Sequence, residues 1–284
     1  MLVDVLDGVI VITLRRPEAL NALHDELNDE ILRVIRRHEA DPAVTGFVLV
    51  GYGTRAFCAG ADIGRFPGML GDAGASAQYA RDCSRLLAHL DAMEKPVVAA
   101  LNGMALGGGL ELAMRCHALI AQRDAWLQFP EITLGIAPGI GAMVVPYRRW
   151  PQAAPLFHGM LRRAERLDVV QAHSAGIVAE LADDYASLIR QAVARVHALA
   201  GKRRAPLDAP VAIAPFDAAG PKAYSREVVG IIEDAVRAAA AAPTLGAALE
   251  IGYGAFGRSA CTAAAREGIS AFGERRKADF SRTG

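Results

Sequence analysis

Two glycine-bearing turns are the parts of this sequence best suited to chemistry through the backbone. They are AFCAGADI (56–63) and ALGGGLELA (105–113), and each follows an apolar run typical of a buried strand. Glycine turns leave backbone N–H groups unpaired by the sheet, so two neighbouring turns can aim two N–H donors at one point. Such a pair is an oxyanion hole, which stabilises a carbonyl oxygen as it gains negative charge. A helix beginning near Gly109 would add the positive end of its dipole.

Two glutamates add side-chain chemistry to these turns. Glu111 follows the glycine triplet, and Glu131 lies in FPEITLGIAPG (129–139). If both turns open on one pocket, the two carboxylates would face each other across it. Two close, half-buried carboxylates titrate as a coupled pair, and one can stay protonated near neutral pH. The pair would then supply one acid and one base, as addition of water to a double bond requires.

Each of these features also has a simpler interpretation. Either turn alone fits an ordinary connection from a strand to a helix. Glu111 fits a first-turn residue that favours the helix dipole or completes a capping box. Gly108, the residue at the N-cap position, has no side chain to reciprocate, which weakens the capping interpretation.

Charge balance and apolar content limit the possible partners. The 284 residues include 31 Lys or Arg and 31 Asp or Glu, so the formal net charge is zero. This balance gives no electrostatic basis for nucleic acid as the main partner. Hydrophobic residues make up 52% of the chain, which predicts a sizeable core. A neutral, apolar chain also tends to associate, so we expect a homo-oligomer.

Cysteine usage and the first residues predict a soluble, cytoplasmic protein with no membrane partner. The four cysteines form no CxxC pair, which favours reduced thiols over disulfides or zinc. The stretch 1–14 carries acids where a signal peptide needs bases, and no apolar run reaches the roughly 18 residues of a membrane span. Five histidines lack metal-ligand spacing and are expected to be solvated or structural: His24, His89, His117, His158 and His173.

Apolar periodicity predicts strands and helices in alternation over the first part of the chain. The expected elements are a hairpin at 3–14 around Asp7-Gly8, a helix at 25–40, a strand at 46–53, a loop at 67–77 and a helix at 78–94. The order apolar strand, glycine turn, helix occurs at 46–66 and again at 97–118. A weaker copy runs from Trp126 through Gly135. The sequence therefore predicts a repeated structural unit of the α/β class.

Strand signals fade beyond about residue 188. The segment 201–225 is rich in Pro, Lys and Arg and is expected to be an irregular insertion, whereas 226–241 and 244–280 are rich in alanine and helical. We therefore expect an α/β core at 1–190 that carries the active site. A helical domain at 191–284 would follow it.

Five stretches follow one another as they do in the crotonase (enoyl-CoA hydratase/isomerase) superfamily, which the chain resembles from about residue 3 to 280. They are RRPEALNAL, FVLVGYGTRAFCAGADI, KPVVAALNGMALGGGLELAMRCH, FPEITLGIAPG and EGISAFGERRKADF. The paired AGAD and GGGLE motifs in this order are specific to the family. The resemblance implies a spiral of repeated β-β-α units with a C-terminal helical domain. That domain would serve oligomerisation, as trimers or dimers of trimers, and pocket closure.

The resemblance also implies roles for individual residues. The backbone N–H groups of Ala59 and Gly108 would hold the thioester oxygen of an acyl-coenzyme A. Four residues, together with Gly108, would line the bound coenzyme A: Ala59, Gly60, Ala61 and Asp62. Glu111 would be the base that activates water, and protonated Glu131 would deliver a proton to the α-carbon. This hydration of a 2-enoyl-CoA needs no metal or redox cofactor, because coenzyme A is part of the substrate.

Other activities within and outside this reaction stay open at the level of sequence. The alternatives are an isomerase, another acyl-CoA enzyme, or a non-catalytic relative that binds acyl-CoA or RNA. Two retained glutamates argue against the non-catalytic form, and zero net charge argues against RNA.

The stretch PGIGAMVVPYRR (138–149) departs from the family pattern, in which Pro-Gly precedes a Gly-Gly-Thr-Gln-Arg-Leu-like stretch. It resembles the back wall of the family's acyl pocket, so acyl preference is left open. Pro146 is expected to break or kink any helix there. Three residues that follow it are expected at the surface or an interface: Tyr147, Arg148 and Arg149. Basic clusters at 202–204 and 275–277 are expected to be solvated, although Lys277 would be within reach of a coenzyme A phosphate. Asp62 is expected either to bind substrate or to cap a turn.

Overall fold

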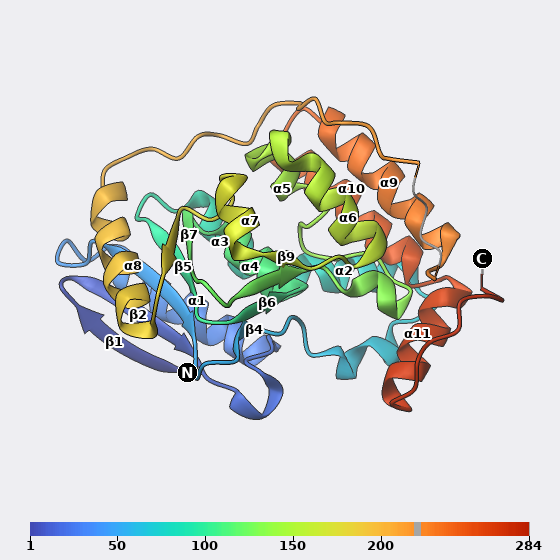
Figure 1. Cartoon of the computed structure of the whole chain (residues 1–284), viewed down its shortest axis with the longest axis horizontal. Coiled ribbons are helices and arrows are strands. Elements are labelled where there is room, and N and C mark those ends of the chain that lie inside the picture. The colour runs from blue at the N-terminus through green and yellow to red at the C-terminus, as the bar shows by residue number, and fades with distance from the viewer. Residues whose placement is uncertain (219–222, 284) are drawn as a thin grey trace. The chain divides into compact units, whose positions relative to one another are not determined.

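The computed structural model describes residues 1–218 and 223–283 (Figure 1). Its contacts divide the chain into two compact units, each assembled from three segments. The first unit takes residues 1–62, 84–127 and 167–205, and the second takes 63–83, 128–166 and the chain from 206 onward. The sequence instead predicts a single boundary near residue 190, and this position lies inside one helix, α8 (Tyr185–Leu199). The sequence predicts where strand signals end, but long-range contacts decide which segments pack together.

A six-stranded sheet forms the centre of the first unit. Its strands, in spatial order, are β1 (Leu2–Leu6), β2 (Val9–Leu14), β3 (Gly46–Gly51), β5 (Val97–Leu101), β7 (Ala118–Gln122) and β10 (Glu180–Ala182). Among the described strand pairs of this sheet, only β1–β2 is antiparallel, and it is the predicted hairpin, with Leu6 opposite Val9. Asp7 and Gly8 both have positive φ, 50° and 73°, as the favoured two-residue hairpin turn requires.

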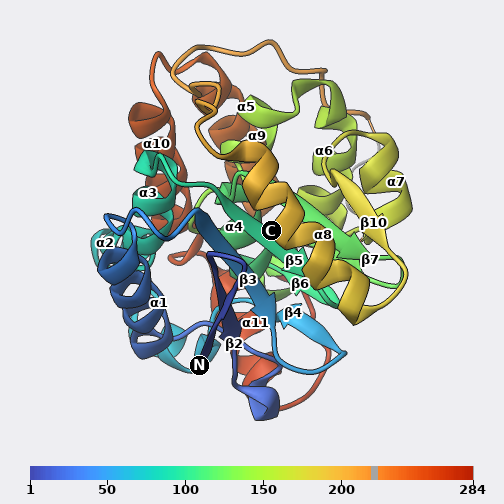
Figure 2. The same ribbon diagram turned by 90° about the vertical axis from the view of Figure 1, so that its left-hand side faces the viewer.

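One face of this sheet is covered by α8, which lies across β5 and its neighbours in Figure 2. Leu188, Ala192 and Val196 of α8 pack on the valine-rich face of β2, β3 and β5. These strands are buried on both faces, which explains why they appear in the sequence as continuous apolar runs rather than as alternating patterns.

A second, four-stranded sheet carries the ends of the repeated units. Its order is β4 (Ala56–Cys58), β6 (Met104–Leu106), β8 (Trp126–Gln128) and β9 (Leu167–Asp168). Each repeat places its first strand in the large sheet and its second in the small one, as the pairs β3–β4, β5–β6 and β7–β8 show. This confirms the predicted repeat. The third copy, however, begins at Ala118 rather than at the predicted Trp126.

Helices fill the remainder of the first unit. They are α1 (Asp25–His38), α3 (Arg85–Ala92), α4 (Gly108–Arg115) and α7 (Val169–Ser174), with a 3-10 turn η1 at Pro17–Ala19. Helix α4 contacts strands of both sheets, and every one of its residues is buried. Its first turn therefore has a fixed position relative to the ends of β4 and β6.

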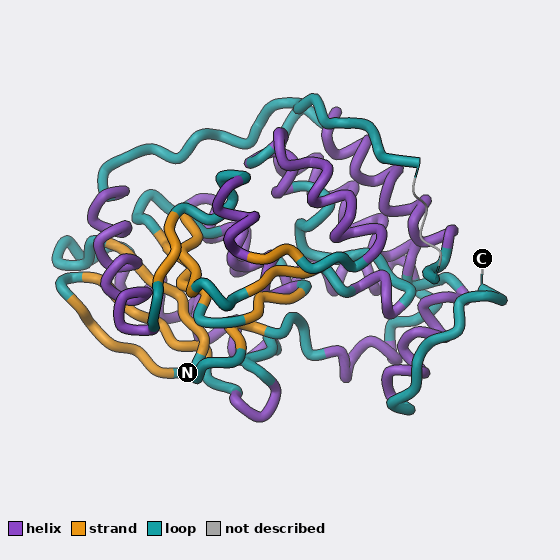
Figure 3. Tube along the Cα trace, viewed as in Figure 1, coloured by secondary structure: helices purple, strands orange, loops and turns teal. Residues whose placement is uncertain are grey.

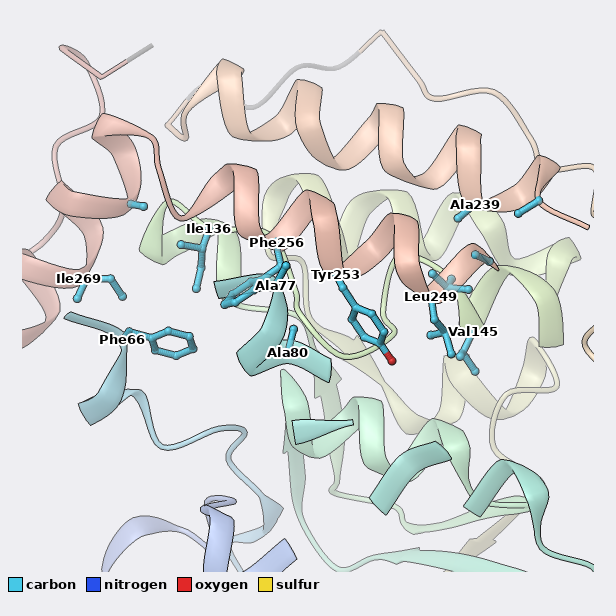
Figure 4. Close-up of a cluster of buried hydrophobic side chains, with 14 residues drawn as sticks. Phe66, Ala77, Ala80, Ile136, Val145, Ala239, Leu249, Tyr253, Phe256 and Ile269 are labelled. Carbon is cyan, nitrogen blue, oxygen red and sulfur yellow. The ribbon is translucent and has the colours of Figure 1, made fainter. Parts of the chain in front are cut away.

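The second unit is helical. Its helices are α2 (Ala73–Cys83), α5 (Val145–Arg149), α6 (Ala154–Arg163), α9 (Arg226–Ala241), α10 (Leu245–Ser259) and α11 (Ala263–Gly273), and its 3-10 turns are η2 (Ile63–Gly68), η3 (Glu131–Leu134) and η4 (Pro151–Ala153). Helix α10 contacts both α2 and α9. Its side chains Tyr253 and Phe256 belong to an apolar cluster with Phe66 and with alanines of α2 (Figure 4).

Two elements predicted between residues 67 and 94 need correction. The helix expected at 78–94 is two helices, α2 and α3, and α2 already begins at Ala73, inside the predicted loop at 67–77. Asp72 accepts a hydrogen bond from the Ala75 N–H at 2.9 Å and so starts the helix. The small residues that suggested a loop instead allow α2 to pack closely on α10.

The insertion expected at 201–225 is irregular wherever the structure describes it. Residues 202–218 form neither helix nor strand, and Figure 3 draws them as a continuous loop. Residues 219–222 of the insertion lie outside the described part. Pro146 begins rather than breaks a helix, because it occupies the first turn of α5, where its missing N–H has no intrahelical partner to lose.

Candidate functional site

The AGAD turn is fixed by backbone hydrogen bonds to the loop at 20–23. The Ala59 N–H donates to the Leu20 carbonyl at 3.0 Å, and the Asp62 N–H donates to the Leu23 carbonyl at 2.8 Å. In return, the Leu23 N–H donates to the Gly60 carbonyl at 2.8 Å. Ala61 and Leu23 thereby form a parallel bridge. The turn is therefore held along its whole length.

This pattern corrects one of the two predicted oxyanion donors. The Ala59 N–H already has an acceptor, Leu20, whereas the Ala61 N–H makes no hydrogen bond within the described ranges. Gly60 is the reason, because its φ of 103° interrupts the alternation of the strand. The N–H groups of Ala59 and Asp62 consequently face the 20–23 loop, and the Ala61 N–H between them faces away. The geometry therefore offers Ala61, two residues later than predicted.

The glycine triplet places the second donor beside the first turn. Gly107 has a φ of 45° and caps α4, which begins at Gly108, so the Gly108 N–H is one of the helix's first, intrahelically unpaired donors. A Cβ at Gly60 would lie 3.6 Å from the Gly108 nitrogen and 3.1 Å from the Leu106 oxygen. The structure thus brings the AGAD turn and the glycine triplet together within the first unit.

Gly109 explains why the triplet needs its last glycine. A Cβ there would lie 2.6 Å from the Cβ, the Sγ and the carbonyl oxygen of Cys58, closer than real Cβ atoms approach. The absence of a side chain lets the first turn of α4 rest on the end of β4. Burial raises the pKa of the Cys58 thiol to about 12, so this sulfur stays neutral beside the two turns and carries no competing negative charge.

The two predicted catalytic glutamates lie in different units. Glu111 is in the first turn of α4, where its N–H donates to the Gly107 carbonyl at 2.9 Å, and the residue is only 3% exposed. Glu131 opens the turn η3 in the second unit, and its carbonyl oxygen accepts a hydrogen bond from the Ile136 N–H at 3.3 Å. Their placement across one pocket stays a prediction.

Asp62 has a partner that neither sequence interpretation included. Its carboxylate accepts a hydrogen bond from the Arg16 guanidinium at 3.1 Å. Sequence reasoning overlooked Arg16 because it lies 46 residues earlier in the chain. The signal available was the RRPEALNAL stretch itself, which contains two arginines with no assigned role.

The residues after Pro146 are not all at the surface. Tyr147 and Arg148 are 1% and 6% exposed, so the expectation that they lie at the surface or an interface is wrong. The Arg148 guanidinium donates to four backbone carbonyls, those of Leu207, Ala209, Ala239 and Ala242. Their positions in the sequence are 59 or more residues away, which is why the pattern around Arg148 gives no sign of burial.

Two other expectations about polar residues can be compared with the structure. Arg204, predicted to be solvated, donates to the Arg115 carbonyl at 2.9 Å, and desolvation lowers the pKa of its guanidinium. His158 is buried, with its ring 4.1 Å from the Phe216 ring, which fits a structural role. Within 1–218 and 223–283, no group of His, Cys, Asp and Glu side chains is arranged to hold a metal ion. The contact of Lys277 with a phosphate stays a prediction.

Two sheets built from repeated strand pairs, with two backbone turns meeting at a helix N-terminus, define a protein of the crotonase fold. The chain belongs to the enoyl-CoA hydratase/isomerase family, whose family model matches residues 4–212. In the described part of the chain, no helix is long and apolar enough to cross a membrane.

Individual relatives match over nearly the full length. A probable enoyl-CoA hydratase of Bacillus subtilis is 33% identical over 273 residues, which cover 96% of this chain and 95% of that protein. A crotonyl-CoA hydratase of Syntrophomonas wolfei is 32% identical, with 96% and 95% covered. The crystal structure of an enoyl-CoA hydratase/isomerase from Xanthobacter autotrophicus Py2 is similar with a TM-score of 0.71 at 24% identity, covering 96% of this chain and 92% of that one, which shows the shared fold.

Proposed function

We propose that this protein adds water to the double bond of a 2-enoyl-CoA thioester and forms a 3-hydroxyacyl-CoA. Relatives that match over nearly the whole chain are named as hydratases of such thioesters. The observation that carries the proposal is the close approach of the AGAD turn to the Gly108 nitrogen. That approach supports two N–H donors, Ala61 and Gly108, acting on one thioester oxygen.

These two donors would activate the substrate. Withdrawal of electron density toward the thioester oxygen makes the β-carbon electrophilic, and the N–H groups and the N-terminus of α4 stabilise the enolate that water addition creates. In other enzymes the loss of one such donor lowers the rate by about 10²–10³. The backbone pair is therefore expected to contribute as much as the acid and base.

The two glutamates would handle the protons. Glu111 takes a proton from water as its oxygen bonds to the β-carbon, and protonated Glu131 gives a proton to the α-carbon of the enolate. The sum of these steps adds one hydroxyl and one hydrogen, the elements of one water molecule. Exchange of the two protons with solvent restores Glu111 as the anion and Glu131 as the acid. No metal or redox cofactor takes part in this scheme.

The remaining parts of the proposal concern binding and assembly. Ala59, Gly60, Ala61 and Asp62 would line the pantetheine and adenosine portions of coenzyme A. The carboxy-terminal helices would support a homo-oligomer of trimers, single or paired. A cytoplasmic setting fits a substrate of this kind.

Hydration of crotonyl-CoA tests the function directly. Loss of the conjugated thioester absorbance is followed for wild type, Glu111→Gln and Glu131→Gln, and each variant is expected to lose about 10²–10⁴ in kcat. Glu94→Gln changes an exposed glutamate of the first unit and serves as the matched control. A wild type that binds a CoA ester but hydrates no enoyl-CoA of any length would refute the proposal. Migration of a 3-enoyl double bond without hydration would establish an isomerase instead.

A further inference from the structure

The loop at 16–23 holds an unusual backbone conformation beside the AGAD turn. Leu20 and Asn21 both have positive φ, 51° and 60°, which non-glycine residues rarely adopt. The Asn21 side chain maintains it, since its Nδ2 donates to the carbonyls of Tyr52 and Ala56 at 3.0 and 2.9 Å. Asn21 is 1% exposed. The loop is therefore anchored to the ends of β3 and β4, and it acts as a rigid support for the AGAD turn.

The Arg16 side chain also connects this loop to the AGAD turn. Its Nη1 donates to the Ala22 carbonyl at 3.0 Å, and its Nη2 donates to the Asp62 carboxylate at 3.1 Å. Ala22 and Asp62 flank the two members of the parallel bridge, Leu23 and Ala61. One guanidinium therefore spans both sides of the bridge that leaves the Ala61 N–H facing away from the loop.

We propose that Arg16 is a positioning residue for the oxyanion hole. By holding Asp62 against Ala22, it fixes the orientation of the peptide between Gly60 and Ala61, and with it the direction of the Ala61 N–H beside Gly108. Arg16 acts through the backbone and touches no reacting atom. The inference rests on the proposed function, since it assigns a task within that hole.

The residue type matches the task. The planar guanidinium presents two N–H donors in a fixed fork, so a single side chain reaches two acceptors at a defined separation. Lysine presents a compact charge on a flexible stem and can satisfy either acceptor without fixing their separation. Arg16 and Asp62 have side chains 20% and 45% exposed, so their pairing contributes little to the stability of the fold. Its effect on donor direction is separate from stability.

Steady-state kinetics and the thioester carbonyl stretch test this role in Arg16→Met, Arg16→Lys and Arg15→Met. Arg15 is the matched control, because it is exposed and its guanidinium lies over the Tyr52 ring, 5.0 Å from the centroid. The stretch is measured by isotope-edited infrared spectroscopy on bound butyryl-CoA labelled at the carbonyl carbon. This saturated ester has no double bond to hydrate, so its stretch reports the oxyanion hole alone.

Arg16→Met is expected to lower kcat for crotonyl-CoA roughly 10-fold, part of the loss expected for a whole donor, with KM within about 2-fold of wild type. The carbonyl stretch should move back toward its value in free butyryl-CoA. Arg16→Lys should recover part of both effects, and Arg15→Met should match wild type. Thermal unfolding of Arg16→Met should shift by no more than about 4 °C.

Two results would overturn the positioning role. One is an unchanged kcat and carbonyl stretch in Arg16→Met. The other is a rise in KM alone, which would mean that Arg16 contacts coenzyme A. Poor folding of Arg16→Met would leave Arg16→Lys to decide, because lysine keeps the charge and loses the fork. If wild type itself neither shifts the stretch nor hydrates crotonyl-CoA, the proposed function fails and the positioning role fails with it.

Discussion

Substitution of Gly109 by alanine sets helix propensity against close packing at the centre of the proposed site. In a helix, alanine is favoured over glycine by about 1 kcal/mol. Here the added Cβ would lie 2.6 Å from three atoms of Cys58, one of them the backbone oxygen. Overpacking of this kind costs about 1–3 kcal/mol. Because the backbone of β4 is held in a sheet, α4 must move, so we expect Gly109→Ala to be less stable than wild type.

The same movement would displace the neighbouring Gly108 N–H. We expect kcat for crotonyl-CoA to fall about 10-fold or more, within the loss attributed to one missing oxyanion donor. Denaturant unfolding and initial rates measure the two effects. Gly230→Ala is the matched control, because Gly230 lies inside α9 and an added Cβ meets nothing within 4 Å. That variant should gain about 0.5–1 kcal/mol and keep its activity. A Gly109→Ala protein as stable and as active as wild type would refute this account of the triplet.

Two further substitutions test the second unit. Arg148→Met should lower the free energy of unfolding by about 3–5 kcal/mol, because four carbonyls lose a charged donor. Hydrogen exchange near Val211 should become faster. The control is Arg149→Met, which removes a cation–π contact with Trp150, and a loss of stability in Arg148→Met no larger than in this control would contradict the prediction. Burial holds the pKa of His158 below 6.5, so the unfolded chain binds this proton at higher pH than the folded chain, and stability should decline as pH falls below about 6.5. His158→Phe should weaken that decline in denaturation midpoints taken at several pH values, and an identical decline would exclude His158 as its source.

The residues that the sequence located well are those whose type answers a local demand. Gly107 and Gly60 both have positive φ, so their presence after apolar strands marks turns that expose backbone N–H groups. Asp7-Gly8 likewise marks the first hairpin, and it is found where predicted. Such signals depend on a few adjacent residues. They can therefore be interpreted without knowledge of how the rest of the chain folds.

The errors arise where a distant segment decides the outcome. Ala59 and Ala61 are the same residue type two positions apart, and only the acceptor at Leu20 separates the engaged N–H from the available one. Arg148 was expected at the surface or an interface because its acceptors lie in the distant 207–242 region. The start of α2 was missed for the same reason, since small residues suit both a loop and a close contact between helices.

A site built from backbone donors constrains its sequence in a particular way. The donors themselves exist in every residue except proline, so chemistry alone does not select the side chains of Ala61 or Gly108. The structural requirement falls instead on the residues that shape the turns, Gly60 through its φ and Gly109 through its close approach to Cys58. It also falls on Arg16, which donates a hydrogen bond to Asp62 of the AGAD turn. A variant that spares both glutamates but alters one of these supports should therefore lose kcat while it keeps its affinity for the coenzyme A ester.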